Sequence, residues 1–187
     1  GWRRRRQVGW PREQGLRAGG GRGAGRAGAR PAEGVALMVG LTIRVPNSEG
    51  VDRSHDQAGY ALPGQQLALV QAVAKADKPT VVVLLSGMAV GIDYIGGRHD
   101  WPLLVPGYGG IFGPQAIAET LFGDYAPSGK LPYTIYPEAW AGATSMVDRS
   151  MTAGQGRTYR FYGYGDKTLK ATYAFGDGIS YTTFTHE

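Results

Sequence analysis

The sequence has no cysteine, only three histidines, and no apolar run approaching the roughly 20 residues that are needed to span a bilayer. The absence of cysteine excludes a disulfide framework and a thiolate metal site. The three histidines are scattered without ligand spacing, so we expect neither a metal nor a cofactor. A chain without cysteine suits any redox compartment, and its localisation is left open.

Acidic residues are almost missing from the first 30 positions, which hold nine Arg, nine Gly and one Glu. The remainder therefore carries 20 − 9 = 11 basic and 15 − 1 = 14 acidic residues, and the net charge of +5 comes from this leader. With no hydrophobic period, residues 1–34 are predicted to be disordered. Three origins are considered: a stretch translated from a wrong frame or an intron, an organellar transit peptide, and a nucleic-acid-binding tail. The absence of Ser favours the first, so no nucleic-acid partner is expected.

Residues 35–187 are enough to bury one core, and their apolar pattern predicts an α/β domain. The run T-V-V-V-L-L at 80–85 predicts a strand that is covered on both faces, ended by a turn at Ser86-Gly87. A second buried strand is predicted at 35–41 and a helix over 62–76 between them, which makes one βαβ unit with parallel strands. A short strand at 103–105 and a helix at 115–122 follow.

The loop after the first strand concentrates charge, because Glu49, Asp52 and Arg53 lie within five residues. Ligands bind at the carboxyl ends of strands in open α/β sheets. A carboxyl group there can act as a general acid if its pKa is raised, and a neighbouring Arg holds a second carboxylate ionised. An ordinary solvated loop is the competing interpretation. The glycine-rich turn at 106–114 matches neither phosphate-binding motif, so phosphate binding is not expected.

Residues 121–137 carry a motif that is far more specific for one family. They read L-F-G-D-Y-A-P-S-G-K-L-P-Y-T-I-Y-P. This segment resembles the hallmark F-G-D-Y-N-P-S-G-R-L-P-x-T of glycoside hydrolase family 3, which includes β-glucosidases and β-xylosidases. Five more matches follow the family's order: E-G-V-D-R at 49–53, L-P-G-Q at 62–65, V-L-L-S-G at 83–87, G-R-T-Y-R-F-Y at 156–162 and F-G-D-G-I-S-Y-T-T-F at 175–184. The Tyr-rich form at 156–162 resembles the β-xylosidase and arabinofuranosidase branch. Departures occur at Ala89, Ala126, Lys130 and 106–118.

The resemblance implies the second domain of that family, a three-layer α/β/α sandwich with a mostly parallel sheet, truncated at its first strands. Retaining glycosidases use two carboxyl groups about 5 Å apart. By resemblance Glu49 is the catalytic acid/base, whereas the nucleophilic Asp belongs to an N-terminal (β/α)₈ barrel that this sequence lacks. Asp52 and Arg53 are expected to bind each other and to orient Glu49 or the sugar.

The implied partners are an oligosaccharide or aryl glycoside and the barrel domain, with no membrane involved. The alternative is a non-catalytic carbohydrate-binding or scaffolding domain. The alternation of Arg157, Tyr159, Arg160 and Tyr162 suggests a strand with one packed face. The loop residues His55, His99 and Trp101 are possible sugar contacts for which solvated or packed roles are favoured. The sugar, its linkage and the oligomeric state are left open.

Overall fold

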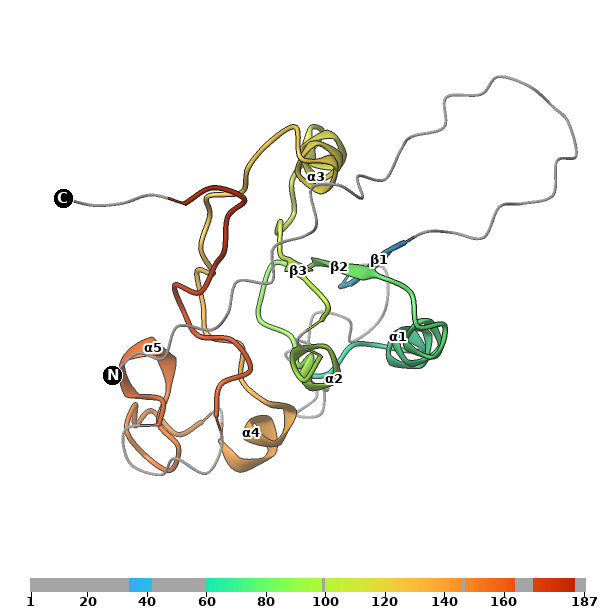
Figure 1. Ribbon diagram of the computed structural model, residues 1–187. Coiled ribbons are helices and arrows are strands. Elements are labelled where there is room, and N and C mark those ends of the chain that lie inside the picture. Colours follow the sequence, from blue (N-terminus) through green and yellow to red (C-terminus); the bar gives the residue numbers. More distant parts are fainter. Residues whose placement is uncertain (1–33, 42–59, 99, 146, 164–169, 184–187) are drawn as a thin grey trace, which may run out of the picture.

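A parallel three-stranded sheet lies at the centre of the computed structural model, which describes residues 34–41, 60–98, 100–145, 147–163 and 170–183. Its strands are β1 (Val35–Gly40), β2 (Thr80–Leu85) and β3 (Leu103–Leu104), in the order β1-β2-β3. Helices α1 (Gln66–Lys75) and α2 (Asp93–Gly96) lie on one side of the sheet, and α3 (Gly113–Phe122) lies on the other (Figure 1). The predicted three-layer α/β architecture is confirmed.

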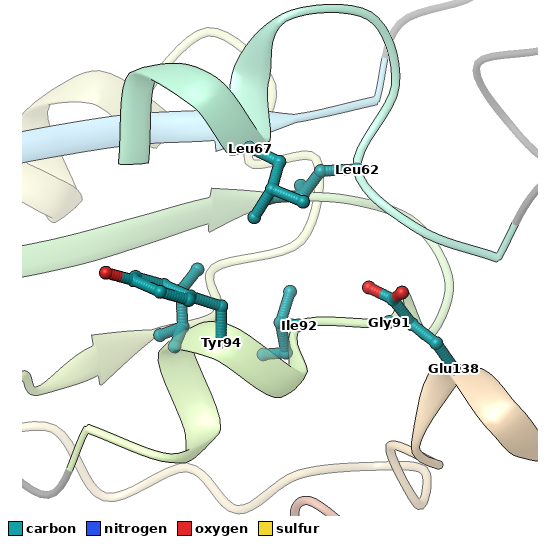
Figure 2. A pocket seen from close by; sticks show the side chains of 7 residues that line it. Leu62, Leu67, Gly91, Ile92, Tyr94 and Glu138 are labelled. Atoms are coloured by element: carbon teal, nitrogen blue, oxygen red, sulfur yellow. The ribbon is translucent and has the colours of Figure 1, made fainter. Parts of the chain in front are cut away.

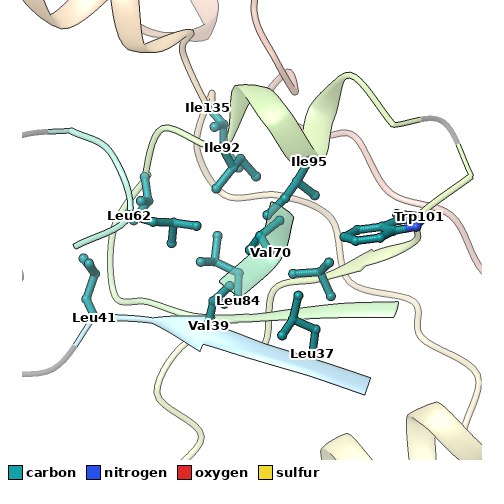
Figure 3. Packing of buried hydrophobic residues seen from close by; sticks show 12 residues of the cluster. Leu37, Val39, Leu41, Leu62, Val70, Leu84, Ile92, Ile95, Trp101 and Ile135 are labelled. Carbon is teal, nitrogen blue, oxygen red and sulfur yellow. The ribbon is translucent and has the colours of Figure 1, made fainter. Parts of the chain in front are cut away.

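Strand β2 is buried on both faces, as its uninterrupted apolar run predicts. Val82 and Leu84 contribute to the main core beneath the sheet, and Val81 and Val83 alternate toward the α3 side, where they are also buried. Figure 3 shows the main core between the sheet, α1 and α2. It includes the following buried side chains: Leu37, Val39, Leu41, Leu62, Val70, Val90, Ile92, Ile95, Trp101 and Ile135.

Helix α1 begins at Gln66, four residues later than predicted, because the Pro63-Gly64 turn precedes it. Val70 is fully buried, and Val73 and Ala74 pack against the same core. The predicted inward face is therefore confirmed. The register pairs Val35 with Thr80 and Gly40 with Leu85, so the βαβ unit has parallel strands as expected.

The family hallmark at 121–137 spans the end of α3 and an irregular ribbon. Gly123 ends α3 in the left-handed conformation, with φ of 84°. After Leu131 the chain is extended but does not form a regular strand. It runs antiparallel to 173–177 through a single bridge at Ile135 and Tyr173 and through the hydrogen bond from Leu131 N to Asp177 O at 2.9 Å. Pro132 has no N–H to donate, which limits the ladder.

The predicted strand at 157–162 is wrong, because these residues form the single-turn helix α5 (Thr158–Phe161). The N–H groups of Phe161 and Tyr162 donate to the carbonyls of Arg157 and Thr158, at 3.3 and 3.1 Å. Alternating aromatic and basic residues imitate a strand pattern, but they are equally compatible with one helical turn. A further short helix, α4 (Glu138–Ala143), lies between the hallmark and α5.

Trp101 belongs to the core and not to a sugar site, since only 4% of its surface is exposed. The guanidinium of Arg98 lies over its ring, 4.5 Å from the centroid. The packed role favoured for Trp101 is therefore confirmed, while His99 lies outside the described residues. Among the residues that the structure describes, none of the helices has the length and apolarity to cross a bilayer.

Candidate active site at the carboxyl edge of the sheet

The three parallel strands end at one edge, where β1 leads into residues 42–59. Glu49, Asp52 and Arg53 fall in that segment, which lies outside the described residues, as does His55. The structure therefore tests neither their contacts nor their roles. It does describe the two points at which the chain enters and leaves the segment, at Leu41 and Tyr60.

The side chain of Gln66 holds the entry point. Its Oε1 accepts a hydrogen bond from Gly40 N at 2.7 Å, and its Nε2 donates to Gly40 O at 2.8 Å. The N–H groups of Val35 and Leu41 donate to Pro79 O and Leu85 O, on the β2 side of the strand. Because backbone groups of successive residues point to opposite sides of a strand, the N–H and C=O of Gly40 point toward the outer edge of the sheet. The Gln66 carboxamide therefore pairs with Gly40 as the peptide group of a neighbouring strand would.

Tyr60 holds the exit point through its backbone and its phenol. Its carbonyl accepts from Gly91 N at 2.6 Å, and its hydroxyl oxygen accepts from Tyr136 N at 2.9 Å. Burial raises the pKa of the Tyr60 phenol above its ordinary value, so the group stays protonated at neutral pH. Both ends of the segment that carries Glu49 are thus fixed to the folded domain.

The ends of β2 and β3 form the rest of this edge. The Ser86 hydroxyl donates to Met88 O at 2.5 Å and accepts from Met88 N at 3.1 Å, which closes the predicted turn. After β3 the chain forms a glycine-rich loop into α3. In that loop Tyr108 packs its ring against Gly87.

A second pair of carboxyl groups, Asp93 and Glu138, lies near Tyr60, and its contacts indicate a structural role. Asp93 accepts from Glu138 N at 2.9 Å and from the Thr172 hydroxyl at 3.1 Å. Partial burial, and then the charge of Asp93, raise the pKa of Glu138. Glu138 also lines a cavity with Leu62, Leu67 and Tyr94 (Figure 2).

The cavity beside Glu138 has a volume of only about 10 Å³, which is at the lower limit for one water molecule. It cannot admit a sugar. An open depression of about 290 Å³ lies instead at the carboxyl end of β1, lined by Met38, Val39, Gly40, Leu41, Gln66 and Leu85. Within the described ranges, no group of three or more His, Cys, Asp or Glu side chains is placed to hold a metal ion.

Residues 22–181 match the glycosyl hydrolase family 3 C-terminal domain. The chain belongs to this family. Beta-D-xylosidase 1 of Arabidopsis thaliana is 37% identical over 88% of this family 3 chain. The beta-xylosidase/alpha-L-arabinofuranosidase 2 of Medicago sativa subsp. varia is 35% identical over 85% of it.

Solved structures agree with this assignment. A family 3 exo-β-xylosidase in complex with a xylobiose aziridine probe superposes with a TM-score of 0.66 and 27% identity, over 81% of this chain and 19% of that one. A β-glucosidase from Kluyveromyces marxianus in complex with glucose gives a TM-score of 0.60 and 29% identity, over 80% and 18%. The family 3 chain spans about 20% of the length of the curated relatives it matches. The family, the α/β domain and the glycosidase relatives predicted from the sequence are confirmed.

Gln66 and Tyr60 are the residues at this edge to which sequence reasoning gave no role. A signal for Gln66 is present, since it occupies the last position of the family's L-P-G-x-Q motif. Nothing in the sequence around Tyr60 marks it, because its hydroxyl meets Tyr136 across 76 positions.

Proposed function

We propose that this chain is the second-domain part of an exo-acting retaining β-glycosidase of the β-xylosidase or β-glucosidase kind, in which Glu49 supplies the acid/base carboxyl group. The observation that supports this most strongly is the family membership together with the place of E-G-V-D-R, in the segment that departs from the carboxyl end of β1. That edge is where α/β sheets bind ligands.

The two fixed ends of the segment give the proposed acid/base a physical basis. A carboxyl group that protonates a leaving oxygen must stay within hydrogen-bond reach of it. The two hydrogen bonds between the Gln66 carboxamide and Gly40, called the Gln66 clasp below, and the Tyr60 contacts hold the points from which the segment extends. Asp52 and Arg53 are proposed to pair with each other, and to orient Glu49 or the sugar.

The nucleophile is proposed to come from an N-terminal (β/α)₈ barrel domain, with an oligosaccharide or aryl glycoside as the substrate. This chain spans about 20% of the length of the relatives that it matches, which include proteins named as β-xylosidases. In this mechanism the barrel carboxylate attacks the anomeric carbon, while Glu49 protonates the departing oxygen. Glu49 then activates water, which hydrolyses the glycosyl intermediate.

The test is kinetic and uses an enzyme in which this chain is joined to a family 3 barrel. Glu49→Ala should slow glycosides with poor leaving groups far more than aryl glycosides with good ones, because only the former need a proton on the departing oxygen. Added azide should rescue turnover of the activated substrate, since a small anion attacks the intermediate without a general base. The matched control is Asp52→Ala. If Asp52→Ala shows this behaviour and Glu49→Ala acts like the parent enzyme, the acid/base has been assigned to the wrong carboxyl group.

A further inference from the structure

The ring of Tyr108, in the loop after β3, packs against Gly87 in the turn after β2. A Cβ atom placed on Gly87, two residues beyond β2, would lie 2.7 Å from Tyr108 Cε2 and 3.2 Å from Cδ2. Such contacts are too short for real atoms, so the ring packs directly on the backbone of Gly87. This contact joins the loop after β3 to the turn after β2, at the edge from which the Glu49 segment departs.

More than half of the surface of Tyr108 still faces solvent. Tyr108 is 57% exposed, although its loop is part of a well-formed connection between β3 and α3. Ile111 and Phe112, 92% and 75% exposed, add apolar surface to the same loop.

We infer that Tyr108 is a stacking platform for a pyranose ring of the substrate, an inference that rests on the proposed function. β-Linked xylopyranose and glucopyranose units carry equatorial hydroxyl groups, which leave apolar C–H faces above and below the ring. A tyrosine offers a flat apolar body with a polar tip, which suits a partly hydrated ligand of this kind. Its contact with Gly87 restricts the ring before the sugar binds, which reduces the conformational freedom that is lost when the sugar stacks.

The Gly87 contact supplies a second way to disturb the platform without touching the tyrosine. An alanine at 87 must displace the ring, because its methyl group would occupy the space of Cε2. Gly87 is itself exposed, so Gly87→Ala leaves the core intact. Tyr108→Phe keeps the flat ring and removes only the hydroxyl group. Tyr159→Ala is the matched control, since Tyr159 is also an exposed tyrosine, 67% exposed and stacked on Phe175.

The experiment measures xylotriose binding to the purified 187-residue chain by saturation-transfer NMR and by titration, with far-ultraviolet circular dichroism to verify folding of each variant. Tyr108→Ala and Gly87→Ala should weaken binding by about three- to tenfold, the range expected for loss of one aromatic stacking contact. Tyr159→Ala should bind like the parent chain, and Tyr108→Phe, which keeps the flat ring, should retain this binding.

Equal binding by Tyr108→Ala and the parent chain would overturn the platform, and so would an equal loss in Tyr159→Ala. An absence of xylotriose binding to the parent chain would also overturn it, and would favour a protein-docking role for Tyr108, Ile111 and Phe112. The proposed function is judged separately, by the leaving-group dependence of Glu49→Ala in the barrel-joined enzyme. Failure of one is therefore distinguishable from failure of the other.

Discussion

At the scale of single residues, Gln66 shows how one side chain can complete a sheet edge. Strand β1 has β2 on one side and, among the described residues, no strand on the other. The carboxamide of Gln66 satisfies both backbone groups of Gly40 that point to that open side. An amide fits this position because it offers one donor and one acceptor in the geometry of a peptide group.

Replacing Gln66 with Leu, which has a similar volume, should lower the free energy of unfolding by about 1–3 kcal/mol, because two partly buried backbone groups lose their partner. Urea denaturation followed by circular dichroism measures this change. The neighbouring Gln65 is exposed, so Gln65→Leu is the matched control and should change stability by less than about 0.5 kcal/mol. Equal effects at the two positions would show that the clasp contributes nothing.

Among whole elements, helix α5 is the one that the sequence pattern mispredicts, and two glycines beside it explain its geometry. Gly156 precedes the helix with φ of 75°, and a Cβ atom there would lie 2.1 Å from Phe161 O. Gly154 has φ of 57°, yet open space where a side chain would be. Gly156 is therefore constrained both by its left-handed backbone and by the close approach of Phe161, whereas Gly154 is constrained by its left-handed backbone alone.

Gly154→Ala should cost about 1–2 kcal/mol of stability from the left-handed backbone alone. Gly156→Ala should cost about 3 kcal/mol or more, because it adds a clash with a backbone carbonyl that cannot move independently. Thermal unfolding of both variants measures the difference. If the two alanines are equally destabilising, the close approach to Phe161 does not constrain the turn.

The elements with a strong local pattern were predictable, and those built by distant contacts were not. The apolar run of β2 and the period of α1 determine their structure within a few residues of sequence. By contrast, the ribbon joining Ile135 to Tyr173 depends on hydrogen bonds between segments 38 residues apart. The alternation at 157–162 is the opposite case, in which a short local pattern suits two structures, and Gly156 is compatible with the close turn that the helix makes.

At the scale of the whole molecule, the candidate site was likewise predictable where it follows from local pattern, and not where it depends on distant contacts. The βαβ pattern predicted that the chain leaves the carboxyl end of the first strand just before the E-G-V-D-R motif, and β1 does end at Gly40. The contact between Tyr108 and Gly87 was not predictable, since it joins the ends of two different strands. The roles of Glu49, Asp52 and Arg53 stay predictions, because these residues lie outside the described part of the chain.

The isolated 187-residue chain should have no appreciable glycosidase activity, since a retaining mechanism needs a nucleophile besides the acid/base. Release of nitrophenol from aryl β-xylosides and β-glucosides measures this directly. Turnover by the purified chain that disappears in Glu49→Ala would contradict the proposed division of the active site between two domains. Turnover that persists in Glu49→Ala would indicate a contaminating enzyme, which the same preparation from an empty vector checks.

The Gln66 clasp also has a consequence for hydrogen exchange. Two successive amide protons at the end of β1 depend on different elements: that of Gly40 is held by a side chain of α1, and that of Leu41 by the carbonyl of Leu85 in β2. Opening of the first turn of α1 therefore exposes the Gly40 amide to deuterium while Leu41 stays protected. The exchange rates of these two neighbours separate local motion of the helix from separation of the strands.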